Sequence, residues 1–176
     1  ISKMKISIGE KLETTKPEWN PNFRGRVLLW TEQGIGDEVF FASLIPELVE
    51  KVDKLIVKLD KRLIPLFQRS FDHSIVYIDK DTLVEEDRYD FQIPIGSLPK
   101  LFRNDIKSFE KVPNQYLKVD KIKTRNIRNK INNSKHEKTI GISWKSSSKE
   151  KRIKSLSLEE LILGIYSPKI KFICLQ

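Results

Sequence analysis

The chain has 176 residues, 39% of them hydrophobic, so it is long enough to bury the core of one domain, or of one domain and part of another. Its single cysteine, Cys174, excludes an internal disulfide, its apolar runs are too short to span a membrane, and no signal peptide is recognisable, so we expect a soluble, cytoplasmic protein. The formal net charge is +9, and the excess lies in residues 100–154, with 17 basic and 5 acidic side chains.

The basic segment has two interpretations. Clustered Lys and Arg side chains attract the phosphates of nucleic acid or of a membrane surface, because binding releases counterions. The alternative is a solvated surface in a chain that is rich in Lys, Ile and Asn throughout. We favour the solvated surface, and we do not expect nucleic acid to be the partner.

The chain begins with a segment that shows no periodicity. Residues 1–24 include KPEWNPN, in which prolines punctuate an extended chain, and they are interpreted as a connector. Residues 26–30, RVLLW, form an apolar run typical of a buried strand. The helix that follows has an apolar stripe at helical spacing, made of Phe41, Leu44, Ile45, Leu48 and Val49. Pro46 lies within this stripe and is expected to kink the helix.

Strands and helices then alternate. The sequence predicts further strands at residues 54–59, 74–78 and 90–96. It predicts a short helix at 61–71 broken by Pro65, a helical turn at 97–102, and a strand or edge segment at 115–119. This alternation predicts an α/β fold with a parallel sheet covered on both faces.

A second unit is predicted after a charged linker helix at residues 120–138. It consists of a strand at 139–144, the polar loop KSSSKEKRIKS, a helix at 158–165 and a last strand at 171–176. One β-α-β unit leaves much of its sheet uncovered, so we expect these residues to open a truncated domain of a longer protein.

The GIGD sequence, residues 34–37, joins the first strand to its helix. A glycine-rich turn there presents backbone N–H groups and the positive end of a helix dipole to an anion. The dinucleotide fingerprint would need glycine where Val39 stands, and the P-loop ending is also missing. Asp37 either caps the helix, which its spacing alone favours, or projects into a cleft as a general base.

The loop at residues 145–155 is a second candidate anion site. Its four serines and its cations, between a strand and a helix, could cradle a diphosphate, although a mobile, solvated loop explains the same composition equally well. No metal site is expected, because His73 and His136 are isolated and are predicted to lie on the surface. Glu32 and Glu38 are expected to be solvated.

Several blocks of the sequence together resemble a known domain. They are LLWTEQGIGDEVFFASLIPEL, DFQIPIGSLPKLF, YLKVD, GISWKSSS with RIKSLSLEEL, and FICLQ. From Trp19 to Gln176 they resemble the glycosyltransferase-like domain at the C-terminus of many bacterial tetratricopeptide-repeat proteins, a relative of the lipopolysaccharide heptosyltransferases. The resemblance implies a GT-B arrangement, with residues 25–119 as the acceptor-side Rossmann-like domain and 139–176 as the start of a truncated, Rossmann-like nucleotide-sugar-binding domain.

The resemblance also implies roles on the acceptor side. Gly34, Gly36 and Asp37 match the Gly-Asp loop of the heptosyltransferases, in which the aspartate is the catalytic base. Gln33, beside that loop, is expected to reach the acceptor.

On the donor side, the resemblance points to the second loop. Lys154 matches the lysine that pairs with the donor diphosphate, and Arg152 is the alternative. Lys145 and Ser146 belong to the same donor loop. The enzymes follow that lysine with tryptophan and proline, where this chain has Leu156 and Ser157.

Three functions follow, in order of preference. The first is part of an inverting, metal-independent glycosyltransferase that needs a nucleotide-sugar co-substrate but no cofactor, with a saccharide or protein acceptor, an adjoining tetratricopeptide-repeat segment and Asp37 as base. The 176 residues alone are expected to be inactive, because most of the donor domain would be missing. The second is a non-catalytic binding or scaffold domain beside helical repeats, and the third is a basic nucleic-acid-binding module.

Overall fold

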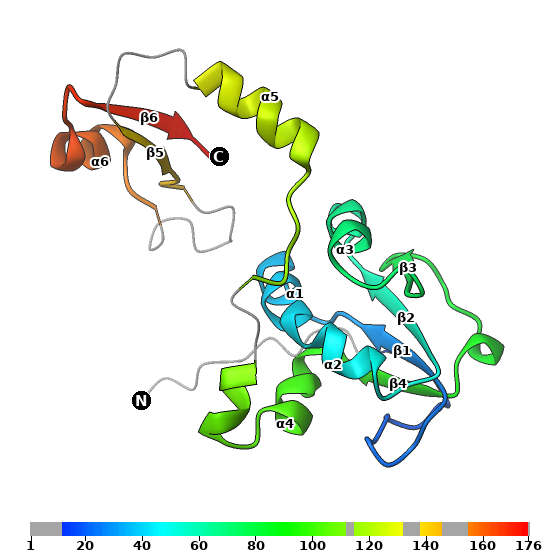
Figure 1. The fold of residues 1–176 in the computed structure, drawn as a ribbon. Helices are drawn as coiled ribbons and strands as arrows, with labels where there is room; N and C mark the ends of the chain where they lie inside the picture. Colours follow the sequence, from blue (N-terminus) through cyan, green and yellow to red (C-terminus); the bar gives the residue numbers. More distant parts are fainter. Residues whose placement is uncertain (1–11, 112–114, 132–137, 146–154, 176) are drawn as a thin grey trace. The chain divides into compact units, whose positions relative to one another are not determined.

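The computed structural model describes residues 12–111, 115–131, 138–145 and 155–175. The chain divides into two compact units, with the boundary between Val119 and Asp120 (Figure 1). Among the described residues, no helix is both long enough and apolar enough to cross a membrane.

Unit 1, which ends at Val119, is built on a parallel sheet. Its strands are β1 (Arg26–Trp30), β2 (Lys54–Leu59), β3 (Val76–Asp79) and β4 (Phe91–Pro94). The four strands lie in the order β3-β2-β1-β4, and all neighbouring pairs are parallel. The predicted α/β class with a Rossmann-like parallel sheet is therefore confirmed.

After Arg26, the inner strand β1 is apolar because both faces of the sheet are covered. Val27 and Leu29 belong to the core cluster formed with the helices, whereas Leu28 packs on the opposite face with Ile56 and Tyr89. Each of these side chains is at most 2% exposed. Successive strand residues point to opposite faces, so two covered faces require an uninterrupted apolar run.

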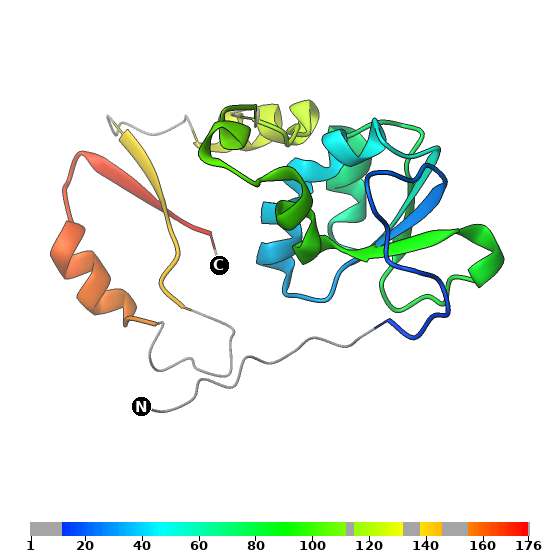
Figure 2. The same ribbon diagram turned by 90° about the horizontal axis from the view of Figure 1, so that it is seen from below.

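Short helices pack on the first of these faces (Figure 2). They are α1 (Ile35–Phe41), η1 (Ala42–Leu44), α2 (Ile45–Val49), α3 (Ile64–Ser70), η3 (Ile95–Ser97) and α4 (Leu98–Phe102). Two further 3-10 segments are η2 (Glu86–Arg88) and η4 (Ile106–Lys111). The predicted interruption at Pro46 is confirmed: the helix changes to η1 just before α2, since proline has no N–H for the carbonyl of Ala42.

The helix predicted at residues 61–71 differs from the observed α3. Helix α3 begins only at Ile64, so Pro65 lies in the first turn of this helix and does not break it. The prediction of a break was wrong because a first-turn N–H has no acceptor within the helix, and proline loses nothing there.

Residues 115–119 were predicted to be a strand or an edge segment. They form no strand, so the strand prediction is wrong. The segment crosses the edge of the core, where Tyr116 and Leu117 pack against the main apolar cluster. Its backbone bonds to α3 instead of a strand, because the amide of Lys118 donates to Ser70 Oγ at 2.9 Å.

The described part of the N-terminal segment lies along β4. The amide of Trp19 donates to the Gln92 carbonyl at 2.8 Å, and the Trp19 ring is only 2% exposed. The hydroxyl groups of Thr14 and Thr15 donate to the Glu86 carboxylate and lower its pKa to about 2. The segment predicted to be a connector therefore packs on unit 1.

The entrance to β1 is held by glycine and an ion pair. Gly25 has φ +152°, and a Cβ there would lie 3.0 Å from a ring atom of Phe91, so both backbone and space favour glycine. The Arg26 guanidinium then donates to the Asp90 carboxylate at 2.7 Å. These hydrogen bonds lower the pKa of Asp90 to about 2.

Unit 2, which begins at Asp120, contains a β-α-β unit. Its elements are α5 (Lys121–Ile131), β5 (Lys138–Ile142), α6 (Leu158–Ile165) and β6 (Ile170–Cys174). β5 and β6 pair in parallel, as predicted. The charged helix is also present as α5, and its Ile122 and Ile127 are more than half exposed.

Helix α6 starts with a capping box. Ser157 Oγ accepts the amide of Glu160 at 3.1 Å, and the Glu160 carboxylate accepts the amide of Ser157 at 3.0 Å. The pair satisfies two N–H groups that the helix itself cannot use. Ser157 therefore has a local structural role as the N-cap of α6.

Candidate active site

The candidate site lies at the carboxyl edge of the unit 1 sheet. Because β1, β2 and β4 are parallel neighbours, the segments that follow them meet at this edge: residues 31–34, Asp60 and η3. Open parallel sheets place their binding sites at this edge. The GIGD turn joins β1 to α1 there.

The Asp37 carboxylate is exposed in the first turn of α1. Gly34 is the N-cap residue, with an extended backbone, and its carbonyl accepts the Asp37 amide at 2.9 Å. Within the described residues, the Asp37 side chain makes no hydrogen bond or ion pair. It therefore makes no capping hydrogen bond, and its carboxylate is available to a ligand.

The two glycines of the turn leave open surface beside this carboxylate. A Cβ on Gly36 would have no neighbouring heavy atom within 4 Å, and one on Gly34 would meet only Asp37 Oδ2, at 3.6 Å. Neither glycine has the positive φ that would demand its residue type. Their effect is to keep side-chain atoms away from Asp37, next to an exposed Gln33.

Glu38 is fully buried, so the prediction that it is solvated was wrong. Its Oε2 accepts the backbone N–H of Asp60 at 2.9 Å, which ties α1 to the segment after β2. Its Oε1 is buried without a hydrogen-bond partner among the described residues. The carboxylate next to Asp37 thus holds the turn in place from inside the fold.

Glu32 ties the same turn to the other neighbouring strand, so it is not freely solvated either. Its Oε1 accepts the amide of Gly96 at 3.2 Å, in η3 after β4. A Cβ on Gly96 would stand 2.5 Å from that oxygen, so glycine makes room for the carboxylate. Glu32 Oε2 and Thr31 Oγ1 are buried and have no partner in the described part of the chain.

Asp60 is the best-partnered carboxylate at this edge. Both of its oxygens accept from the Arg62 guanidinium, at 2.9 and 2.8 Å, and the Lys80 ammonium lies 3.7 Å away. The hydrogen bonds from Arg62, followed by the charge of Lys80, lower the pKa of Asp60. Asp60 is thus neutralised by protein cations, in contrast to Asp37.

The predicted donor-binding residues belong to unit 2. Lys145 is exposed and follows β5 after a short segment. Ser146, Arg152 and Lys154 lie outside the described residues. The structure thus brings together Gln33, the two turn glycines and Asp37 in unit 1.

The histidines and acids of the described chain give no metal cluster. No group of three or more His, Cys, Asp or Glu side chains with suitable geometry occurs in the described ranges. His73 is exposed, as predicted, and His136 falls outside those ranges.

Sequence reasoning missed the burial of Glu38, although a signal for it was present. Glu38 precedes Phe41 by three residues and Ile45 by seven, so the helical period places it on the same face as the apolar stripe. An acidic residue on a core-facing stripe indicates a buried, hydrogen-bonded carboxylate. The partner, a backbone amide after another strand, has no such sequence signal.

Comparison with curated proteins finds a similarity to Protein FlbA of Caulobacter vibrioides. The chain is 27% identical to FlbA over 170 residues, which cover 86% of this chain and 28% of FlbA. The chain therefore spans little more than a quarter of that curated relative. No protein-family model matches the chain. No solved structure matches it either.

Proposed function

We propose that this chain is part of a glycosyltransferase. It transfers a sugar from a nucleotide-activated donor to an acceptor hydroxyl with inversion and without a metal ion, and Asp37 is the general base. The donor diphosphate is bound by the loop of Lys145, Ser146, Arg152 and Lys154. The acceptor lies against Gln33 and the glycines of the turn.

The observation that carries this proposal is the state of the Asp37 carboxylate. It is exposed at the carboxyl edge of a parallel sheet, it makes no hydrogen bond within the described chain, and glycine leaves the adjacent surface open. A general base must reach its proton directly or through one water. Its neighbours Glu32 and Glu38 are engaged in holding the turn, so Asp37 is the carboxylate that is free to act.

The proposed step is a single displacement at the anomeric carbon. Asp37 removes the proton of the acceptor hydroxyl as that oxygen bonds to the anomeric carbon. The bond from this carbon to the diphosphate breaks, and the nucleoside diphosphate leaves with the electron pair. Lys and Arg side chains stabilise the negative charge that develops on the leaving group.

The test uses the native full-length protein that contains this segment. It is incubated with a panel of nucleotide sugars and saccharide or protein acceptors, and release of nucleoside diphosphate is measured. We expect Asp37→Asn to lower turnover by about 10²- to 10⁴-fold, because an amide does not accept the proton. The control, Asp81→Asn, removes another exposed carboxylate, after β3, and should leave turnover unchanged.

Three outcomes contradict this reasoning in different ways. Equal turnover by the wild type and Asp37→Asn removes Asp37 as the base. Saturable nucleotide-sugar binding without turnover of any acceptor favours the non-catalytic scaffold. Turnover by the 176-residue chain alone contradicts the expectation that this part is inactive.

A basic nucleic-acid-binding function is supported by one observation. Helix α5 has the sequence KIKTRNIRNKI, with five cations and no acidic residue, and most of its side chains are exposed. If all five contact phosphates, the logarithm of the DNA-binding constant should fall with the logarithm of salt concentration at a slope of about −4.5. A slope near zero rules this function out.

A further inference from the structure

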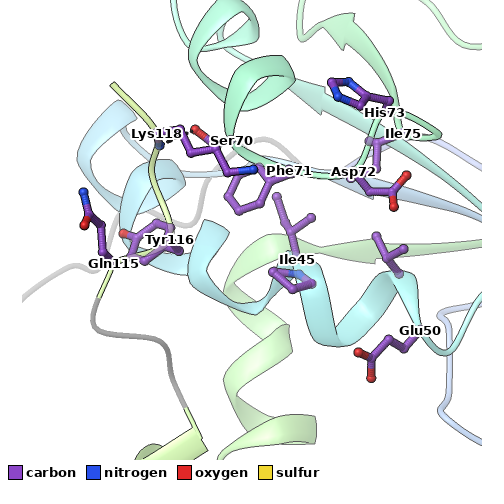
Figure 3. Close-up of a pocket in the computed structure, with 12 residues that line it drawn as sticks. Ile45, Glu50, Ser70, Phe71, Asp72, His73, Ile75, Gln115, Tyr116 and Lys118 are labelled. Atoms are coloured by element: carbon purple, nitrogen blue, oxygen red, sulfur yellow. Dashed lines mark hydrogen bonds between the residues drawn. The ribbon is translucent and has the colours of Figure 1, made fainter. Parts of the chain in front are cut away.

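Unit 1 contains a pocket that shares no residue with the turn of Asp37. Its volume is about 600 Å³, within the range of small-molecule sites. Three segments line it: α2 with Glu50, the end of α3 with the residues that follow it up to Ile75, and residues 115–118 (Figure 3).

The middle of the pocket is apolar. Ile45, Phe71 and Ile75 line it and are at most 8% exposed. The rings of Phe71 and Tyr116 are stacked, with centroids 6.4 Å apart and an interplanar angle of 14°. Such a surface suits an aromatic or aliphatic body.

The walls are held by hydrogen bonds, so the pocket is present without a ligand. Tyr116 Oη donates to the Val39 carbonyl at 2.9 Å. The amide of Lys118 donates to Ser70 Oγ at 2.9 Å, and its carbonyl accepts from Arg69 Nε at 2.8 Å. A site fixed in advance loses less conformational entropy when it binds.

The polar groups lie at opposite ends of this apolar surface. Figure 3 shows Glu50 and Asp72 on one side, and Lys118 and Gln115 on the other. The hydrogen bonds of Ser74 lower the pKa of Asp72, so it remains a carboxylate. Neither Glu50 nor Lys118 forms an ion pair within the described residues, so both charges are available to a ligand.

We propose that this pocket binds a small zwitterionic molecule with an apolar body. Its ammonium group faces Glu50 and Asp72, its body lies over Phe71, and its carboxylate faces Lys118. A free dipeptide with apolar side chains is the simplest molecule of this class. The proposal does not depend on sugar transfer, because it uses none of the residues assigned to that reaction.

The test is calorimetric titration of the 176-residue chain with phenylalanyl-leucine. We expect saturable binding with Kd below about 1 mM. Glu50→Gln and Lys118→Gln should each raise Kd about three- to tenfold, since each removes one ionic contact at a partly exposed site. The matched controls, Glu85→Gln and Lys61→Gln, change exposed side chains outside the pocket and should leave Kd unchanged.

The N-acetylated dipeptide separates charge recognition from apolar binding. It retains the body and the carboxylate but loses the charge that faces both Glu50 and Asp72, so acetylation should raise Kd at least as much as Glu50→Gln does for the free dipeptide. No saturable binding, or a Kd that neither acetylation nor Glu50→Gln changes, overturns the proposal. Because the side chains of Glu50 and Lys118 are exposed, both variants should fold, and circular dichroism of each variant checks this.

Discussion

Replacing Glu38 by alanine tests how the candidate site is held together. Alanine keeps Cβ and removes one buried methylene group, Cγ, which contributes about 0.8 kcal/mol to folding. It also leaves the buried N–H of Asp60 without its 2.9 Å acceptor, which costs about 1–3 kcal/mol. Alanine also removes the buried, unpartnered Oε1, and this gain offsets part of the loss of stability. We expect the free energy of unfolding to fall by about 2–3 kcal/mol.

Glu38→Gln is the matched comparison. Glutamine keeps both methylene groups and an oxygen that can accept the Asp60 amide, so its stability should stay within about 1 kcal/mol of the wild type. Glu85→Ala, at an exposed site, should change stability by no more than about 0.5 kcal/mol.

The assay is urea unfolding followed by tryptophan fluorescence. Trp19 and Trp30 are buried in unit 1, and a Trp144→Phe background removes the signal from unit 2. A loss of about 2–3 kcal/mol lowers the midpoint by about 1–2 M urea. If the alanine and glutamine variants unfold at the same urea concentration, the bond to Asp60 does not hold the turn, and the reasoning is refuted.

The remaining predictions concern the entrance to β1 and the glycines. The lowered pKa of Asp90, about 2, means that its contribution to stability is present above pH 4 and is lost as the pH falls towards 2. Between pH 5 and pH 2, the free energy of unfolding measured in urea should therefore fall less for Asp90→Asn than for the wild type. Part of the fall that remains in the variant is due to Glu86, whose pKa is also lowered. Gly25→Ala should destabilise by about 1–3 kcal/mol, since its φ is +152°. Gly36→Ala, within α1, should be neutral or stabilising by up to about 1 kcal/mol; equal thermal midpoints for the two variants would contradict this.

Much of the secondary structure could be predicted because its signals are local. The apolar runs of β1 and β2 and the stripe of the first helix identify their elements directly. Pro46 also acts through its own backbone, so its effect was predictable. Pro65 was not, because its effect depends on where α3 begins, and that start has no clear capping residue.

Residues 115–119 show the limit of strand patterns. A short segment with apolar residues matches both a strand and a chain that packs over a core edge. Ser70 Oγ, 48 positions away from Lys118, accepts the amide that a strand would have given to a neighbour. A contact over that sequence distance has no local signal.

By itself, the sequence determined the α/β class, the four strands of unit 1 and the place of the glycine turn between β1 and α1, since these depend on residue periodicity and local sequence. Only the tertiary structure decided which carboxylates are free. Glu32, Asp37 and Glu38 are chemically alike and close in sequence, yet Glu38 is buried against the segment after β2, Glu32 bonds to η3 after β4, and Asp37 is exposed. The reason is that their partners are backbone amides of other strands' loops, which reach the turn only once the parallel sheet has formed.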